Sequence, residues 1–267
     1  MSFDREQSRL ELQEQGFTVI RGLHSTEEIK NLKSLLEAYY DASATFSGAP
    51  ARDQKDKRIF NLASKNHAFI RFICKSVVLE LLSDLQDVHY RWISQNLWNF
   101  IINSSSARSS GDFLDLHIDS GFPFLGNNPL GFVVINAIDS SSVLNGTTFL
   151  TPGSHHSGTF TDRSTNNIVH IALDPGDVAI LDSRIWHGAG ENTSGESRWT
   201  INTHYTRWFF KQDMDIPRTI SQEIFEMCTE QEKILLGFCS IPSPGEHDRI
   251  NIKCGVEFLK SQVKDHF

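Results

Sequence analysis

The chain has 267 residues, a formal net charge of −8 and a hydrophobic fraction of 39%. This length is typical of one large β-rich domain or two small ones, and the apolar fraction is sufficient for a sizeable core. No cluster of lysines or arginines of the kind that binds nucleic-acid phosphates is present in the sequence. The composition therefore argues against nucleic acid as the main partner.

No segment of the sequence is typical of a membrane span or an export signal. The longest uncharged stretch, residues 120–138, has spanning length but contains two prolines and three glycines, which would leave backbone groups unsatisfied in lipid. The first fifteen residues are charged and lack the apolar core of a signal peptide. The four cysteines show neither a CxxC pair nor disulfide-rich density. We therefore expect a cytoplasmic protein with no membrane partner.

The N-terminal region predicts a helix, a strand and a second helix. Residues 5–15 are charged and helix-prone, and Gly16 is placed to end that helix. Residues 17–20 alternate in the manner of a strand. Ser25 and Glu28 have the spacing of a capping box, which predicts a helix with an apolar stripe directly after them.

The middle of the chain changes from helical to strand-like patterns. Residues 42–60 predict a loop, and residues 68–85 predict one helix, because apolar side chains recur there three and four residues apart. Short β-branched and aromatic runs then predict strands at 90–102, 112–118, 131–138, 147–151, 168–173, 178–182 and 199–210. Many short strands at this spacing predict an antiparallel sandwich or barrel. With a helical tail at 221–238, the sequence predicts the α+β class.

Two histidines and an aspartate have the arrangement of a metal site. His117 and Asp119 lie at the end of a predicted strand, where alternation places both on one face. His187 is the best third ligand, because it closely follows the predicted strand that ends near residue 182. Two imidazoles and one carboxylate on one face of an octahedron are typical of non-haem Fe(II) oxygenases, with tetrahedral zinc as the alternative. We call these three residues the metal triad.

Arg198 follows the metal triad across a polar loop, eleven residues after His187. If that loop connects a hairpin, Arg198 enters the neighbouring strand near the height of His187. Its guanidinium can then hold a carboxylate in a bidentate grip that lysine cannot reproduce. The alternative is a surface arginine paired with Glu191 or Glu196, and the spacing alone favours neither.

The order of these motifs resembles the phytanoyl-CoA dioxygenase family of Fe(II)- and 2-oxoglutarate-dependent oxygenases. The resemblance runs from about Gly16 to about Arg207 and rests on His117-x-Asp119, Asn145-Gly146, Pro152-Gly153-Ser154-His155, Gly176-Asp177, His187 and Arg198. It implies a double-stranded β-helix, or jelly roll, flanked by helices. On this resemblance the chain is a single dioxygenase domain with a helical part at about 1–87, a jelly-roll core at about 88–210 and a helical tail at 211–267.

The resemblance also implies roles for the site residues. The metal triad would bind iron, and Arg198 would bind the distal carboxylate of 2-oxoglutarate. Gln95 and Asn99 match a Gln and an Asn that some members use near this cosubstrate, the alternative being two polar residues on a solvent-facing strand. The chain departs from the family at Ala189, where many members have a small hydroxyl residue.

The implied activity is hydroxylation, or another oxidation of a C–H bond, of a small metabolite or an intermediate of secondary metabolism. The implied cofactors are Fe(II), 2-oxoglutarate and O₂, with ascorbate supporting turnover in vitro and succinate and CO₂ as coproducts. Asp119 favours hydroxylation, because related halogenases have a small residue in its place. The alternatives are a non-redox, cupin-like isomerase or metal-binding protein, and an oxygenase that acts on a protein side chain.

The sequence says less about the substrate. Phe122, Phe124 and Trp208 are apolar enough to line a substrate pocket, although a place in the core is the stronger alternative for each. No basic cluster is evident for the phosphates of coenzyme A, which disfavours an acyl-CoA substrate. Whether the chain is a monomer or a homodimer stays open.

Overall fold

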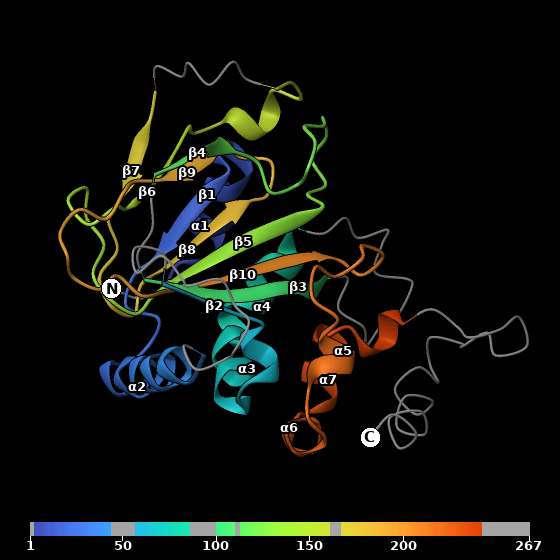
Figure 1. Cartoon of the computed structure of the whole chain (residues 1–267). Helices are drawn as coiled ribbons and strands as arrows, with labels where there is room; N and C mark the ends of the chain where they lie inside the picture. The colour runs from blue at the N-terminus through green and yellow to red at the C-terminus, as the bar shows by residue number, and fades with distance from the viewer. Residues whose placement is uncertain (1–2, 44–56, 86–99, 110–112, 161–166, 242–267) are drawn as a thin grey trace, which may run out of the picture. The chain divides into compact units, whose positions relative to one another are not determined.

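The computed structural model describes residues 3–43, 57–85, 100–109, 113–160 and 167–241 (Figure 1). The chain forms two compact units, one of residues 1–60 and 106–202 and one of residues 61–105 and 203–267. The single-domain organisation expected above stays a prediction. Within the described part of the chain, no helix is both long and apolar enough to cross a membrane.

The first unit begins with the helix, strand and helix that the sequence predicts. Helix α1 (Arg5–Gln15) ends at Gly16, whose φ of 83° is readily reached only by glycine. Strand β1 (Phe17–Ile20) follows, and helix α2 (Thr26–Ser43) begins after it. Ser25 caps α2, since its Oγ accepts a hydrogen bond at 3.2 Å from the N–H of the third residue of that helix.

The strands of the described residues form two sheets. The larger has the order β1-β8-β5-β10-β3-β2 and the smaller the order β4-β9-β6-β7. The strands after β1 are β2 (Arg58–Phe60), β3 (Phe100–Arg108), β4 (Leu114–His117), β5 (Gly131–Ala137), β6 (Thr148–Leu150), β7 (Val169–Ile171), β8 (Val178–Asp182), β9 (His187–Ala189) and β10 (Thr200–Arg207). Antiparallel pairing joins β8 to β1 and β5, β9 to β4 and β6, β6 to β7, and β2 to β3.

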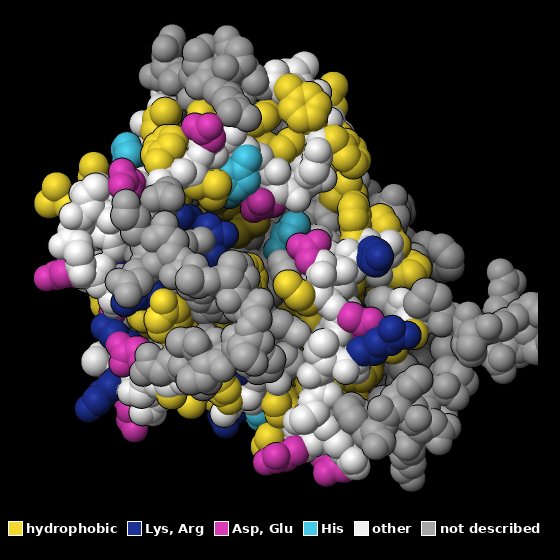
Figure 2. Space-filling model, in the orientation of Figure 1, with side chains coloured by type: hydrophobic (Ala, Val, Ile, Leu, Met, Phe, Trp, Pro, Cys, Tyr) yellow, Lys and Arg dark blue, Asp and Glu magenta, His cyan; other side chains and the backbone are white. Residues whose placement is uncertain are grey.

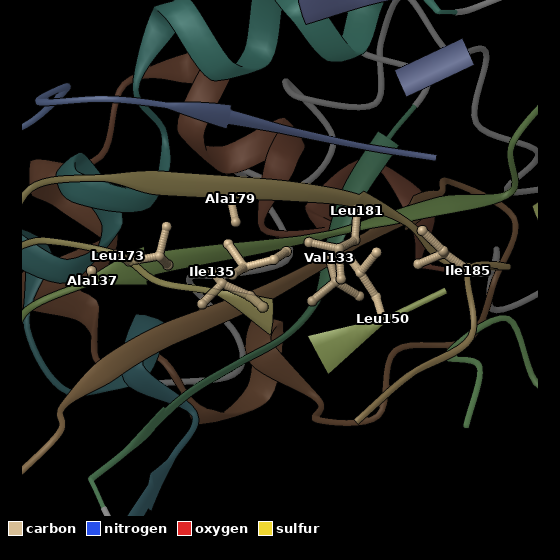
Figure 3. Close-up of a cluster of buried hydrophobic side chains, with 9 residues drawn as sticks. Val133, Ile135, Ala137, Leu150, Leu173, Ala179, Leu181 and Ile185 are labelled. Carbon is tan, nitrogen blue, oxygen red and sulfur yellow. The ribbon is translucent and has the colours of Figure 1, made fainter. Parts of the chain in front are cut away.

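The hydrophobic core of the first unit is made by residues from both sheets. Val133 and Ile135 of β5 lie in register with Leu181 and Ala179 of β8, and they meet Leu150 of β6 (Figure 3). Each of these five residues is at most 7% exposed. All seven residues of β5 and all five of β8 are buried. Both strands therefore read in the sequence as apolar runs rather than as alternating patterns.

The second unit is mainly helical. It contains α3 (His67–Ile73), α4 (Ser76–Asp84), α5 (Ile216–Thr219), α6 (Gln222–Met227) and α7 (Glu230–Leu235), with single 3-10 turns η1 (Leu62–Ser64) and η4 (Phe238–Ser240). The prediction of one helix at 68–85 was wrong, because Lys75 has an extended ψ of 125° that separates α3 from α4. The tail at 221–238 is likewise divided into α6 and α7.

Two further predictions of local structure need correction. Residues 58–60 of the predicted loop form β2, because they pair with residues 106–108 of β3. Strand β9, which begins at His187, was not predicted, since His-Gly-Ala lacks the β-branched and aromatic residues typical of strands. In both places a distant partner strand decides the structure, and a local pattern does not report it.

Candidate functional site

The metal triad converges in the first unit. His117 ends β4 and pairs in register with His187, the first residue of β9. Asp119 lies two residues beyond His117, with its Oδ1 3.6 Å from the Nε2 of His117 and its Oδ2 3.4 Å from the Nε2 of His187. One donor atom from each residue lies within 4.8 Å of the other two. Histidine and acidic side chains are visible together on the face in Figure 2.

Backbone carbonyls orient both imidazoles. The Nδ1 of His117 lies 2.8 Å from the carbonyl oxygen of Asp115, and the Nδ1 of His187 lies 3.0 Å from that of Ile185. A carbonyl oxygen can only accept, so each Nδ1 carries a proton and the Nε2 of each ring faces the common point, where its lone pair can bind a metal when the ring is neutral. Metal-bound histidines are oriented by this type of hydrogen bond.

The electrostatic environment of the two histidines differs. Burial lowers the pKa of His117, and the nearby His187 lowers it further. Burial also lowers the pKa of His187, but the Asp119 carboxylate outweighs it, so the net pKa of His187 is raised. His187 is 6% exposed, whereas the side chains of His117 and Asp119 are 35% and 31% exposed. The triad is therefore anchored at His187 and accessible from the side of the other two residues.

The short connection between β8 and β9 holds the backbone of Asp119. The carbonyl oxygen of Ser183 accepts hydrogen bonds at 2.9 Å from the N–H groups of Asp119 and Ser120. The N–H of Ser183 donates to the carbonyl of Gly131 at 3.0 Å. Ser183 thus fixes both ends of the segment that follows Asp119. Ser183 itself lies only four positions before His187 in the sequence.

Arg184 secures the same segment with its side chain. It is 4% exposed and grips Asp182 through Nε–Oδ1 and Nη2–Oδ2 contacts of 2.9 and 2.6 Å. Its Nη1 donates to the carbonyl of Gly126 at 2.6 Å, and its guanidinium lies over the ring of Phe124 at 4.7 Å. The bidentate pair and the cation–π contact hold this segment beside the metal triad.

The turn at Pro152–His155 supports the strand that carries His187. Ser154 Oγ accepts a hydrogen bond at 2.9 Å from the N–H of Trp186. His155 is 2% exposed, and its Nε2 lies 3.2 Å from the carbonyl of Gln13. Among the described residues, His155 is not a member of the triad cluster.

Arg198 is buried and is not the surface residue of the alternative reading. It is 4% exposed, and its Nη1 donates to the carbonyl of Gly146. Gly146 has a φ of 85°, and a Cβ there would lie 2.3 Å from the carbonyl oxygen of Gly190, so only glycine fits. Among the described residues, no carboxylate lies within ion-pair distance of the Arg198 guanidinium, and its Nε has no hydrogen-bond partner.

The charge of Arg198 is therefore costly where it stands. Burial lowers its pKa to about 10, and the neighbouring Arg108 contributes to that shift. Arg108, which is 9% exposed, also lowers the pKa of His117. Two arginines in electrostatic range of each other, with one in range of the metal triad, favour binding of an anion.

The remaining predicted site residues have different outcomes. Gln95 and Asn99 lie outside the described residues. Phe122 is 51% exposed and Trp208 is 38% exposed, so neither is a core residue. Phe124 is partly buried beneath Arg184. Trp208 belongs to the second unit, where it meets Phe209 edge to face.

Sequence reasoning missed the contributions of Ser183, Arg184 and Arg108. The first two act through contacts to residues more than fifty positions away, which no local pattern reports. Arg108 is the single charged residue from 98 to 111 and lies between the strands predicted at 90–102 and 112–118, so no predicted element contains it and no local pattern indicates its role.

The donor set fits a divalent iron ion. Two neutral imidazoles and a carboxylate supply three ligands, which is the facial arrangement that leaves positions open for other ligands. Arg198 supplies a buried cation for an anionic molecule.

Comparison with known proteins agrees with this geometry. The sequence profile of the phytanoyl-CoA dioxygenase (PhyH) family matches residues 12–200. An uncharacterised protein of Mycobacterium tuberculosis is 32% identical over 168 residues, which are 62% of this chain and 59% of that protein. This chain thus spans less than two thirds of that relative. Dioxygenase af480 of Aspergillus fumigatus is 24% identical over 248 residues, covering 85% of this chain and 77% of that protein.

Solved structures share the fold. HygX from Streptomyces hygroscopicus, with nickel and 2-oxoglutarate bound, has a TM-score of 0.60 at 17% identity, covering 79% of this chain and 90% of HygX. SnoN, a non-haem α-ketoglutarate-dependent epimerase from nogalamycin biosynthesis, has a TM-score of 0.57 at 14% identity, covering 77% and 84%. The fold is therefore the cupin-like jelly roll of these oxygenases, as the sequence predicts. By the match over residues 12–200, the chain belongs to the phytanoyl-CoA dioxygenase family.

Proposed function

We propose that the chain is a non-haem Fe(II)- and 2-oxoglutarate-dependent dioxygenase that hydroxylates a C–H bond of a small molecule. The family membership, the metal triad and the buried Arg198 support this proposal. Fe(II) with 2-oxoglutarate and O₂ supplies the oxidation of an unactivated C–H bond, with succinate and CO₂ as coproducts.

The residues of the chain would bind and orient the metal ion and 2-oxoglutarate. The Nε2 atoms of His117 and His187 and a carboxylate oxygen of Asp119 would hold one face of the metal ion. The guanidinium of Arg198 would hold the distal carboxylate of 2-oxoglutarate. Ser183 and Arg184 keep Asp119 and the following segment in place, so the ligand geometry is set before any ligand binds.

Arg198 is the single observation that carries the proposal. A non-redox, cupin-like metal protein, or a zinc site, would use the same two histidines and aspartate. Neither has a use for a buried guanidinium that lacks a carboxylate partner within the described residues. A dicarboxylate cosubstrate would supply that partner, because one of its carboxylates remains for Arg198 when the other end binds the metal.

A small molecule is the proposed substrate. Two structural neighbours have been solved with small molecules bound, HygX with hygromycin B and SnoN with nogalamycin RO. SnoN is an epimerase, so the fold alone does not decide the reaction. We assign hydroxylation because Asp119 places a carboxylate where a halogenase would need space for a halide.

The proposal is tested by iron binding and by 2-oxoglutarate turnover. Under air, with Fe(II) and ascorbate, the wild type is expected to convert 2-oxoglutarate to succinate. The Asp119→Ala variant should lose about a hundredfold in iron affinity, because loss of even a supporting hydrogen bond costs roughly 10–100-fold at metal sites. Asp115→Ala is the matched control, since it removes an exposed carboxylate two residues before His117.

Each outcome has a definite meaning. Iron affinity at the wild-type level in the Asp119→Ala variant would show that the triad is not the iron site. Iron bound by the wild type without any succinate would favour the non-redox metal protein. The substrate is then sought by screening small natural products for coupled succinate release and for product that has gained one oxygen atom.

A further inference from the structure

The second unit contains another group of metal-ligand side chains. His67 is the first residue of α3, Cys228 directly follows α6 as its C-cap, and Glu232 lies in the first turn of α7. One ligand atom from each lies within 4.8 Å of the other two. Helix α3 and the junction between the consecutive helices α6 and α7, which are far apart in the sequence, therefore bring an imidazole, a thiol and a carboxylate together.

The carboxylate of Glu232 is held in a fixed position. Its Oε2 accepts hydrogen bonds from the N–H and the Oγ1 of Thr229 at 2.8 and 3.1 Å, which is one half of a capping box. The same oxygen lies 3.3 Å from the Nε2 of His67. The imidazole and the carboxylate thus point toward each other without a rearrangement of either helix.

The cluster is poorly solvated. Glu232 is 8% exposed and Cys228 is 5% exposed, and the side chain of His67 is 16% exposed. A carboxylate is seldom buried unless it is paired or coordinates a metal ion. Glu232 contacts an N–H and a hydroxyl of Thr229, and the imidazole of His67 is at ion-pair distance, 3.3 Å. A cation bound between the three side chains would compensate the charge of Glu232.

We propose that His67, Cys228 and Glu232 form a second metal site, for a zinc-type divalent ion, distinct from the iron site of the triad. Imidazole nitrogen, thiolate sulfur and carboxylate oxygen are the ligands that zinc takes in proteins, at about 2.0–2.3 Å. In a tetrahedral site such bonds place ligand atoms about 3.5 Å apart. The 3.3 Å between His67 and Glu232 already matches this spacing, and water completes the tetrahedron.

Occupation of the site changes the protonation of Cys228. A cysteine binds a metal ion as its thiolate, so the thiol proton of Cys228 has to leave when the site is filled. Binding a dication breaks the S–H bond, forms the sulfur–metal bond and releases one proton to solvent. The metal affinity is therefore expected to rise with pH.

Cobalt(II) is the probe that separates the two sites. A thiolate bound to cobalt gives a charge-transfer absorption in the near ultraviolet, and the metal triad contains no sulfur. The full chain, titrated anaerobically with cobalt(II), is expected to show this band and to bind two equivalents per chain. The Asp119→Ala variant is expected to keep the band and to bind one equivalent.

Two variants test the ligands, and a third is the control. Cys228→Ser should abolish the band and lower cobalt affinity at this site by about a hundredfold. Glu232→Gln preserves the capping box, which accepts either residue, and should weaken the site without loss of helix α7. Cys74→Ser is the matched control, because this thiol lies in electrostatic range of Cys228 and Glu232 but outside the ligand cluster.

The results decide the proposal in either direction. A band that survives in Cys228→Ser, or that is lost in Cys74→Ser instead, would overturn the assignment. So would a wild type whose only bound equivalent disappears in Asp119→Ala. If Cys228→Ser fails to fold, Glu232→Gln with unchanged cobalt affinity would have the same meaning. None of these readouts depends on turnover of 2-oxoglutarate, so this site and the proposed activity succeed or fail separately.

Discussion

Arg184 and Arg198 are both 4% exposed, but their surroundings differ. Arg184 has a bidentate carboxylate partner in Asp182, a carbonyl acceptor in Gly126 and an aromatic ring beneath it. Arg198 donates to the carbonyl of Gly146 and has no carboxylate partner among the described residues. The two arginines are thus equally buried, but the described residues compensate the charge of Arg184 and not that of Arg198.

The difference indicates two roles for the same residue type. A buried arginine that is paired with a carboxylate needs no further partner, and its removal leaves the carboxylate charge buried and unpaired. A buried arginine without one has an electrostatic cost that a bound anion would relieve. We therefore expect changes at Arg184 to act mainly on folding, and changes at Arg198 to act mainly on the binding of 2-oxoglutarate.

The largest effect on stability is expected for Arg184→Leu. This change leaves the Asp182 carboxylate buried without its partner, which should lower the free energy of unfolding by about 3–5 kcal/mol. Urea unfolding followed by circular dichroism measures it. The double variant Asp182→Leu/Arg184→Leu is the control, because removal of both charges is often neutral or stabilising. A double variant as unstable as the single one would show that the pair is not the cause.

Arg198→Leu is expected to have the opposite profile. The free energy of unfolding should stay within about 1 kcal/mol of wild type, since the side chain loses one hydrogen bond to the described residues and a buried charge is removed. The 2-oxoglutarate concentration for half-maximal succinate formation should rise roughly a hundredfold, corresponding to about 2.7 kcal/mol of lost charge-pair binding.

Arg198→Lys sharpens the test, because lysine keeps the charge but cannot form the bidentate grip. An intermediate 2-oxoglutarate requirement is expected. An unaltered requirement in Arg198→Leu, with iron still bound, would contradict the assigned role. A loss of stability as large as that of Arg184→Leu would remove the contrast between the two arginines.

Arg21 extends the comparison to an exposed arginine and should show the smallest effect. It pairs with the buried Asp177 at 2.6 Å, while its own side chain is 54% exposed. Asp177 also accepts hydrogen bonds from the N–H groups of Gly22 and Asp174 at 2.8 and 2.9 Å. Arg21→Ala should therefore lower the free energy of unfolding at pH 7 by at most about 1 kcal/mol.

The same variant should change how the free energy of unfolding depends on pH in acid. Burial raises the pKa of Asp177, but the Asp174 N–H, Arg21 and the Gly22 N–H lower it more, so the net pKa lies below 3.8. A depressed carboxyl pKa stabilises the fold above the unfolded value and loses that contribution as pH falls through the folded one. Arg21→Ala should move acid unfolding to higher pH, and an unshifted midpoint would show that the backbone donors suffice.

The three triad residues could be named from the sequence, because the HxD pair and His187 both lie close to predicted strands. The predicted strand alternation is not what places Asp119, since β4 ends at His117 and Asp119 lies in the turn after it, where its N–H donates to the carbonyl of Ser183. The short connection after β8 brings His187 to the paired strand. The burial of Arg198 could not be predicted, since the spacing fits a surface position equally well. The second cluster was also missed, because His67 and Glu232 are 165 positions apart and meet only through the packing of short helices.

The fold class could be predicted from strand number and turn residues, whereas several boundaries could not. Apolar spacing continues from α3 into α4 across Lys75, so periodicity alone indicates one helix. Strands β2 and β9 are three residues long and depend on their partners. Short elements of this kind are stabilised by non-local pairing, which a local pattern does not contain.

The connection between β8 and β9 has four residues, 183–186, and this length has a consequence for how the family can diversify. An inserted residue there would displace His187 relative to Ser183, and so relative to Asp119, by up to about 3.8 Å, more than a metal–ligand bond. Extra residues near Ser194, in an exposed turn after β9, would leave these anchors unchanged. Iron-binding relatives are thus expected to conserve the first spacing while varying the second.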